Sequence, residues 1–109
     1  MNVLFSPEVE DYLFELSEIL YQKEYFGFKD SAVEYVRKLI LEIRDTLPIS
    51  KKRPAPAYFE RYGKNLYYTS FRVNKNSQWY AFFSTYIQNG EIIYLVRYIS
   101  NNHVVTQYL

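Results

Sequence analysis

Apolar residues in the first half of the chain recur at steps of three and four, the spacing of one face of an α-helix. The first of these stretches follows Ser6, which can cap a helix by accepting a backbone N–H bond, and Pro7, which suits a first helical turn. The pattern predicts a helix that ends near residues 23–25. Its apolar stripe consists of Val9, Tyr12, Leu13, Leu16, Ile19 and Leu20.

A second helical pattern lies between Gly27, which interrupts the first, and Pro48, which stops the second. Ser31 and Glu34 have the spacing of a capping box, so we expect Ser31 to cap this helix. Its predicted apolar stripe consists of Val33, Val36, Ile40, Ile43 and Leu47. Because the connection between the two helices is short, they are expected to form an antiparallel hairpin.

The second half of the chain has the residue types of strands. The stretches 66–73, 78–86 and 91–99 are rich in aromatic and β-branched residues, and turn-forming sequences separate them. They predict a three-stranded antiparallel meander. Residues 2–5 are expected to add an edge strand, and residues 48–65, which hold three of the four prolines, are expected to form a loop.

A sheet of this kind needs a cover for one face, and the helix hairpin is the available cover. The sequence therefore predicts one α+β domain over residues 1–109, with the order β-α-α-β-β-β and the N-terminal hairpin packed on a small antiparallel sheet. A chain of 109 residues is long enough to bury a core as a single domain.

Composition narrows the possible chemistry. The chain has no cysteine and one histidine, which excludes disulfides and thiolate metal sites and disfavours a structural zinc site. We therefore expect no metal and no other cofactor. No apolar run approaches the ~20 residues that cross a bilayer, and the N-terminal residues lack the basic and apolar parts of a secretion signal. A cytoplasmic protein without a membrane partner is expected.

Charge is distributed unevenly along the chain. Residues 1–50 carry five basic and ten acidic side chains, whereas residues 51–109 carry eight basic and two acidic ones. This split suggests a side that faces a polyanion, although a chance grouping of solvated charges gives the same numbers. The residues expected to contact nucleic acid are Lys51, Lys52, Arg53, Arg61, Lys64 and Lys75.

Arg72 and Arg97 interrupt otherwise apolar strands. A charge in the middle of a strand is costly unless that face is open or the charge is paired. A groove on the sheet would explain both arginines, and so would a solvent-facing edge or an ion pair with a helix carboxylate.

The basic half also holds nine tyrosines, four phenylalanines and the only tryptophan. Aromatic rings beside arginines can stack on unpaired RNA bases, but large aromatic side chains more often build a core. Trp79, Phe71, Phe82 and Phe83 are therefore expected in the core, and the tyrosines remain candidates for base stacking.

The segment 100–108, "SNNHVVTQY", is either a frayed tail or the wall of a site, and we expect a site wall. It contains His103, whose ordinary pKa lies near neutrality, and Tyr108, which would take part in proton transfer if nearby cations lowered its pKa. RNA can be cut without metal when a base takes the 2′-hydroxyl proton, an acid protonates the leaving oxygen and cations bind the phosphate.

These features in this order resemble the RelE/ParE superfamily, the toxins of bacterial type II toxin–antitoxin pairs. The resemblance rests on "FSPEVEDYLFEL", the helix hairpin, the basic loop, "SFRVNKNSQWYAFF" and "YISNNHVVTQY", and it extends over essentially the whole chain. It implies a ribosome-dependent, metal-independent endoribonuclease that cuts messenger RNA and inhibits translation. An antitoxin protein, the ribosome and messenger RNA are the implied partners.

The resemblance also suggests catalytic residues. Arg72 matches a basic position on the family's second strand, His103 and Tyr108 match a C-terminal pair, and Arg97 is a further candidate. Trp79 stands about where RelE-like nucleases often carry a phosphate-binding arginine. This leaves two alternatives open: a non-catalytic ParE-like toxin directed at DNA gyrase, or a member of the family that only binds its antitoxin.

Overall fold

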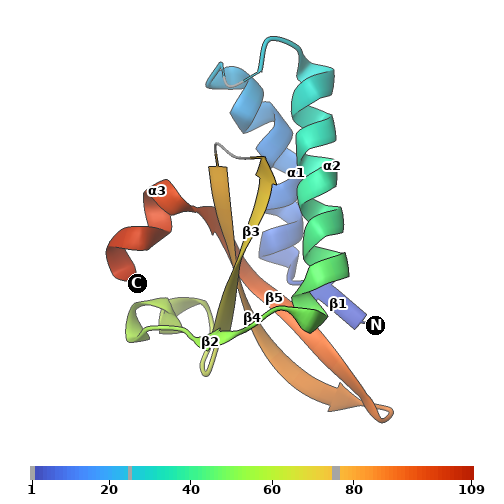
Figure 1. Cartoon of the computed structure of the whole chain (residues 1–109), viewed down its shortest axis with the longest axis vertical. Coiled ribbons are helices and arrows are strands. Elements are labelled where there is room, and N and C mark those ends of the chain that lie inside the picture. The colour runs from blue at the N-terminus through green and yellow to red at the C-terminus, as the bar shows by residue number, and fades with distance from the viewer. Residues whose placement is uncertain (1, 25, 75–76) are drawn as a thin grey trace.

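The computed structural model describes residues 2–24, 26–74 and 77–109 and has a mixed α+β architecture (Figure 1). Its described elements are β1 (Asn2–Phe5), α1 (Pro7–Gln22), α2 (Lys29–Thr46), the 3-10 turn η1 (Leu47–Ile49), β2 (Arg53–Pro54), the 3-10 helix η2 (Ala57–Tyr62), β3 (Tyr67–Asn74), β4 (Ser77–Gln88), β5 (Glu91–Asn101), α3 (Asn102–Val105) and the 3-10 turn η3 (Thr106–Tyr108). The expected order was therefore incomplete, because β2, α3 and the 3-10 segments were not predicted.

The strands form one five-stranded sheet in the order β1-β5-β4-β3-β2. The expected meander β3-β4-β5 is antiparallel, but β1 pairs with β5 in parallel, so the prediction of an antiparallel sheet was wrong. A four-residue apolar stretch carries no signal for the direction of its partner. The predicted loop 48–65 was also partly wrong, since Arg53 and Pro54 pair with β3 at an edge, where a proline without an N–H is tolerated.

Helix α1 begins as its sequence predicts. The Ser6 Oγ accepts a hydrogen bond from the backbone N–H of Val9 at 3.3 Å, and Pro7 occupies the first turn. The backbone N–H of Ser6 donates to the Val96 carbonyl at 2.9 Å, which attaches the start of the helix to β5. Val9, Leu13 and Leu16 are buried, so this part of the predicted apolar stripe is confirmed.

Helix α2 begins three residues earlier than expected. Its N-cap is Phe28, which makes no side-chain capping bond, and Ser31 lies inside the first turn, so the predicted capping box was wrong. Val33 was also misplaced, because its side chain is 46% exposed. The helix instead presents a row at helical spacing to the sheet. That buried row is Ala32, Tyr35, Val36, Leu39 and Ile43.

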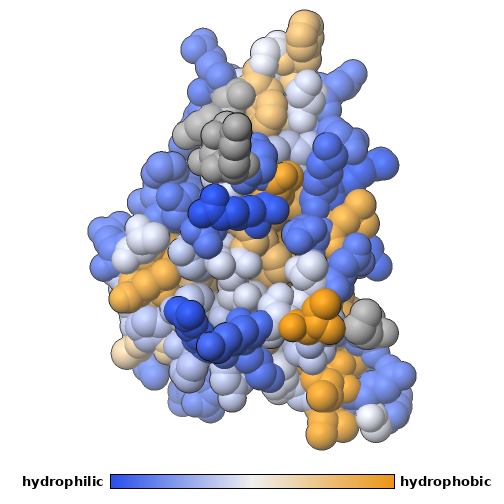
Figure 2. All heavy atoms as spheres, in the orientation of Figure 1, coloured by the Kyte–Doolittle hydropathy of each residue, from blue (hydrophilic) through white to orange (hydrophobic). Residues whose placement is uncertain are grey.

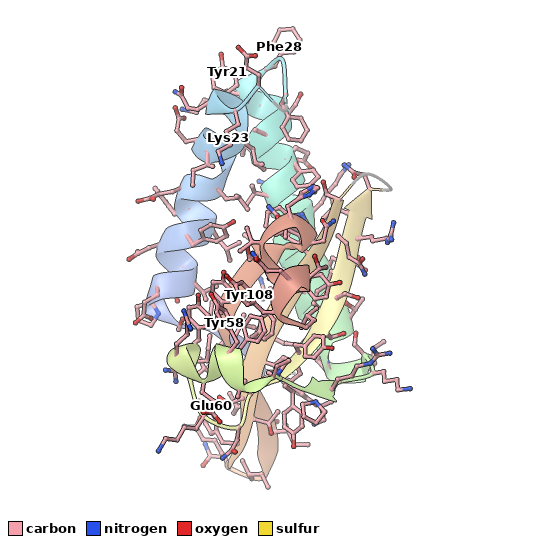
Figure 3. All side chains as sticks on the ribbon, turned by 90° about the vertical axis from the view of Figure 1, so that its left-hand side faces the viewer. Tyr21, Lys23, Phe28, Tyr58, Glu60 and Tyr108 are labelled. Atoms are coloured by element: carbon pink, nitrogen blue, oxygen red, sulfur yellow. The ribbon has the colours of Figure 1, made fainter. Side chains whose placement is uncertain are left out.

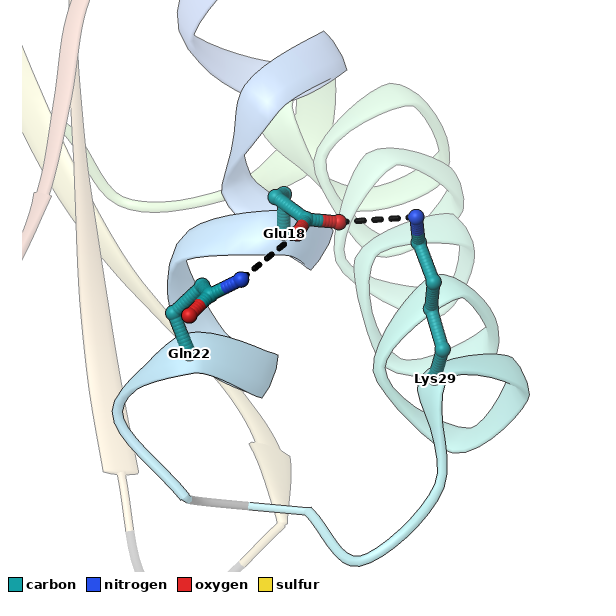
Figure 4. Close-up of polar contacts among 3 residues, drawn as sticks. All are labelled: Glu18, Gln22 and Lys29. Atoms are coloured by element: carbon teal, nitrogen blue, oxygen red, sulfur yellow. Dashed lines mark hydrogen bonds and ion pairs between the residues drawn. The ribbon is translucent and has the colours of Figure 1, made fainter.

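A polar contact joins the two helices near their connection (Figure 4). The Lys29 Nζ lies 2.8 Å from Glu18 Oε2, and the Gln22 Nε2 donates to Glu18 Oε1 at 3.0 Å. This contact lowers the pKa of Glu18 and raises that of Lys29. Both charged side chains are largely exposed, so the pair contributes little to stability compared with the apolar interface below it.

The sheet is covered on one face by the helix hairpin and on part of the other face by a smaller layer. The helix hairpin packs on one face against a core that includes Phe71, Trp79 and Phe83. The other face carries a second, smaller core of Phe59, Leu66, Phe82 and Val105, contributed by η2, the sheet and the C-terminal segment. The expected core positions of Trp79, Phe71, Phe82 and Phe83 are thus confirmed, and the two cores account for much of the aromatic content.

The hairpin between β4 and β5 projects beyond its neighbours. Strand β3 pairs with β4 only as far as Phe83, and β1 pairs with β5 only from Ile93 onward. On this ribbon Ile87 and Ile92 face each other across the strands and are 76% and 52% exposed. Figure 2 shows apolar surface near this tip, at the lower right. None of the described helices is long and apolar enough to cross a bilayer.

Candidate nucleic-acid interface

The C-terminal segment is folded against the sheet and forms a wall over its second face. The side-chain oxygen of Asn101 accepts hydrogen bonds from the backbone N–H groups of His103 and Val104 at 2.9 and 3.3 Å, and so caps α3. The backbone N–H of Gln78 donates to Asn102 Oδ1 at 3.4 Å. Val105 is fully buried, which anchors the segment in the smaller core.

Tyr108 is held by a stack of aromatic and cationic groups. Its ring lies parallel to that of Tyr58, with centroids 3.5 Å apart and an interplanar angle of 8° (Figure 3). The Arg61 guanidinium carbon lies 3.7 Å from the Tyr58 ring centroid, and the Arg61 Nε donates to the Tyr58 carbonyl at 2.9 Å. The last residues of the chain are therefore joined to η2.

This environment raises the pKa of the Tyr108 hydroxyl, chiefly through a hydrogen bond with the Tyr58 side chain. The Arg61 charge acts in the opposite direction but is the smaller effect. From the sequence, a role of Tyr108 in proton transfer required nearby cations to lower its pKa, and in the structure this pKa is raised instead. Tyr108 stays protonated at neutral pH, so it can donate a proton but does not supply a base.

A basic groove of about 770 Å³ lies on the second face of the sheet, between β2, β3 and β4. Lys51, Arg53, Tyr68, Ser70 and Tyr80 are among the residues that line it. The two cations are exposed, the two tyrosine rings are half-buried, and no Asp or Glu is among its described lining residues. Cations beside accessible aromatic rings are the groups that bind single-stranded nucleic acid.

Arg72 lies beside this groove. It alternates along β3 with the buried Phe71, so it faces the same side as Ser70, away from the helices. Its register partner on β4 is Gln78, which lines the groove. The Arg72 side chain is therefore exposed on an open part of the sheet. It makes no ion pair within 4.0 Å to any described residue, so pairing with a helix carboxylate does not explain its position.

Arg97 lies in a different cavity, the arginine cavity, which has a volume of about 410 Å³. This cavity lies between the start of α1, the end of η2 and β5. Its lining includes Glu8, Tyr12, Arg61, Tyr62, Arg97 and Tyr98. Gly63, at φ +156°, lies against Arg97, because a Cβ built there would be 3.7 Å from the guanidinium carbon.

His103 is exposed on α3 and lines a third cavity, of about 530 Å³, between α1, the β3–β4 end of the sheet and α3. This cavity shares Tyr12, Tyr98 and Ser100 with the arginine cavity. None of these three cavities is lined by more than one of the four expected catalytic side chains, which are Arg72, Arg97, His103 and Tyr108.

The remaining basic candidates are divided as well. Lys51 and Arg53 line the basic groove, and Arg61 lines the arginine cavity. Lys52 lies over the ring of Tyr67, with its Nζ 4.9 Å from the centroid. Lys64 is exposed after η2, and Lys75 lies outside the described residues.

Sequence reasoning kept the tyrosines as candidates for base stacking but did not single out those that shape the two sites. Tyr68 and Tyr80 line the basic groove, and Tyr62 and Tyr98 form a stacked pair in the arginine cavity, with centroids 3.8 Å apart. For Tyr68 and Tyr80 the available signal was their alternation with core positions along the strands, which places them on the second face. Tyr62 lies in η2 and Tyr98 follows a bulge in the β4–β5 pairing, so strand alternation gave no such signal for them.

No protein-family model, curated protein or solved structure matches this chain. Among the described residues, no group of three or more His, Asp or Glu side chains is placed to hold a metal ion.

Proposed function

We propose that this protein is a toxin of the RelE/ParE kind that binds messenger RNA on the ribosome and cleaves it. The observation that carries the proposal is the basic groove, where Lys51 and Arg53 lie beside Tyr68 and Tyr80 and no described carboxylate side chain opposes them. Exposed cations attract the phosphate backbone, and half-buried tyrosine rings offer faces for unstacked bases.

The cleavage step would be a transfer within the RNA. The 2′-oxygen attacks the adjacent phosphorus and the bond from phosphorus to the 5′-oxygen breaks, which leaves a 2′,3′-cyclic phosphate and a 5′-hydroxyl. The proton of the 2′-hydroxyl goes to a base, for which His103 is the candidate, and the leaving 5′-oxygen receives a proton from Tyr108. Arg72 and Arg97 would bind the charge on the phosphate.

A second candidate function is a binding toxin without nuclease activity, directed at DNA gyrase. The separation of Arg72, Arg97, His103 and Tyr108 among different surfaces favours it, and so does the buried Trp79 at a position where an arginine would serve cleavage. A chain that only binds an antitoxin fits the same observation. In each case the cognate antitoxin is the expected protein partner, and the cytoplasm is the expected location.

The deciding experiment maps the 5′ ends of a model messenger RNA on programmed ribosomes, with and without the purified protein. We expect new ends at the ribosomal A site, and we expect them to disappear in the His103→Ala variant and in the Lys51→Ala/Arg53→Ala double variant. Lys38→Ala/Arg44→Ala is the matched control, because these two exposed cations lie on α2, outside the basic groove.

Two results would contradict the proposal. If the folded protein produces no new ends, it is not a ribosome-dependent nuclease, and a block of DNA synthesis before protein synthesis on induction in cells would then support the gyrase-directed alternative. If the groove variant cuts as well as the control variant, the groove does not hold the RNA. Fluorescence of the buried Trp79 verifies that each variant is folded.

A further inference from the structure

The arginine cavity contains two permanent positive charges that have no ion-pair partner among the described residues. Neither Arg61 nor Arg97 has an ion pair within 4.0 Å to any described residue, although Glu8 lines the same cavity. An arginine remains charged at any pH that a folded protein survives, and its planar fork matches the oxygens of a phosphate. Two such groups around one cavity favour an anionic ligand.

The position of these arginines is set by the backbone. Arg61 is fixed by its hydrogen bond to the Tyr58 carbonyl and by the Tyr58 ring below it. Arg97 approaches the turn at Gly63, where a side chain would contact both the guanidinium carbon and, at 3.3 Å, Leu66. The two cations are therefore brought to one cavity by η2 and β5 before any ligand arrives, which lowers the entropy cost of binding.

The walls of the cavity are aromatic and able to donate hydrogen bonds. The rings of Tyr62 and Tyr98 are stacked with an interplanar angle of 5°, and Tyr12 lies on the opposing helix. Burial is the main cause that raises the pKa of Tyr12 and of Tyr62 to about 12. Their hydroxyls are thus protonated at neutral pH, where they can donate to a phosphate or a base.

A further polar group in the lining is the carboxylate of Glu8, an acceptor without a described ion-pair partner. A carboxylate accepts hydrogen bonds from the exocyclic amino group of cytosine. The volume, about 410 Å³, lies in the range of pockets that hold small organic ligands. Phosphate-binding cations, a ring-stacking wall and a carboxylate acceptor together match the phosphate, the base ring and the base amino group of a nucleotide.

We propose that the arginine cavity binds one nucleoside phosphate, with the phosphate between Arg61 and Arg97 and an amino-bearing base against the Tyr62–Tyr98 pair. Glu8 selects cytosine over uracil by accepting from the amino group. The ligand is either a free mononucleotide or one nucleotide of an RNA strand. The site shares no lining residue with the basic groove. Arg97 is also a candidate phosphate contact in the cleavage step, but binding of a mononucleotide involves no cleavage and is measured without it.

The test is calorimetric titration of the full chain with cytidine 5′-monophosphate, uridine 5′-monophosphate, cytidine and inorganic phosphate. We expect cytidine 5′-monophosphate to bind best and the Arg61→Ala/Arg97→Ala double variant to weaken it by about 100-fold, since each charged contact is worth roughly tenfold. The Lys51→Ala/Arg53→Ala variant should bind it as the parent does. A short cytidine oligonucleotide separates the two sources of the ligand. Tighter binding of the oligonucleotide than of cytidine 5′-monophosphate indicates one nucleotide of an RNA strand, and weaker binding indicates a free mononucleotide.

Glu8→Gln keeps the shape of the side chain and changes the acceptor, so it tests the base contact without a large risk to folding. It should reduce the preference for cytidine 5′-monophosphate over the uridine nucleotide at least several-fold, whereas Glu10→Gln, an exposed change in the same first turn, should not. Absence of binding by every probe at millimolar concentration overturns the proposal. The proposal is also overturned if nucleotide binding is lost in the Lys51→Ala/Arg53→Ala variant and kept in the Arg61→Ala/Arg97→Ala variant.

Discussion

The hydrogen bond between Trp79 and Tyr35 offers a sharp test of the core between the helix hairpin and the sheet. The Trp79 Nε1 donates to the Tyr35 hydroxyl at 2.8 Å, and both side chains are buried. Tyr35→Phe removes the acceptor without removing the ring, so it leaves the indole N–H buried and without its partner. An unsatisfied buried donor costs about 1–3 kcal/mol.

That loss corresponds to a fall in the melting temperature of roughly 4–12 °C, at about 4 °C per kcal/mol for a domain of this size. Urea denaturation monitored by fluorescence measures it directly, because Trp79 is the only tryptophan and becomes solvated on unfolding. Tyr21→Phe is the matched control. Its ring is exposed on α1, so it should change the free energy of unfolding by less than about 0.5 kcal/mol.

A double-mutant cycle separates this bond from other effects of the substitution. Trp79→Phe removes the donor, and in that background Tyr35→Phe should cost less than in the parent, with a coupling energy of about 1–2 kcal/mol. The cycle is followed by circular dichroism, since the variant lacks tryptophan. If Tyr35→Phe matches the Tyr21→Phe control, or if the two changes are additive, the described packing of α2 on β4 is wrong.

Three further predictions concern the C-terminal segment and the tyrosines with raised pKa values. Val105→Ala should lower the free energy of unfolding by about 2 kcal/mol, because it removes two buried methyl groups and leaves a cavity. Val104→Ala is the control, since Val104 is 44% exposed and its replacement should change the free energy of unfolding by less than about 0.5 kcal/mol. Equal effects of the two changes on the melting temperature would contradict the docked position of α3. Because Tyr12 and Tyr62 have pKa values near 12 when folded and 10.0 when exposed, their contribution to stability is complete below pH 10 and is lost as the pH rises through 12. An absorbance titration should therefore contain a late tyrosine fraction that Tyr12→Phe reduces, and a single transition near pH 10 would refute this. Tyr108→Ala should speed hydrogen exchange in the C-terminal segment while Tyr108→Phe, which keeps the stack on η2, should not.

Periodicity predicted the elements in which apolar side chains repeat at regular spacing and pack against an apolar core on one face. Helix α1 and the meander meet this condition, because Val9, Leu13 and Leu16 repeat at helical spacing and Trp79 and Phe83 alternate along one strand. The start of α2 did not follow from Ser31, since a capping box competes with the packing of residues that the helix presents to the sheet. Tertiary contacts outweigh a cap that contributes about 1 kcal/mol.

The direction of β1 and the existence of β2 could not be predicted for a different reason. Both depend on contacts between residues far apart in sequence, namely Asn2–Phe5 with β5 and Arg53 with Tyr68. The candidate site has the same limitation. Residue types indicated cations and aromatics, but the division between two cavities depends on η2, whose sequence carries no helical periodicity long enough to recognise.

The second layer on the sheet explains why the basic residues fall into separate sites. The small core of Phe59, Phe82 and Val105 occupies the middle of the second face, so the cations can reach solvent only at its margins. Lys51 and Arg53 emerge at the β2 side, whereas Arg61 and Arg97 emerge toward α1. A single continuous RNA track over this face would have to pass across the packed Tyr58–Tyr108 stack. The structure therefore favours two sites with separate ligand contacts, in which substitutions at one margin leave binding at the other unchanged.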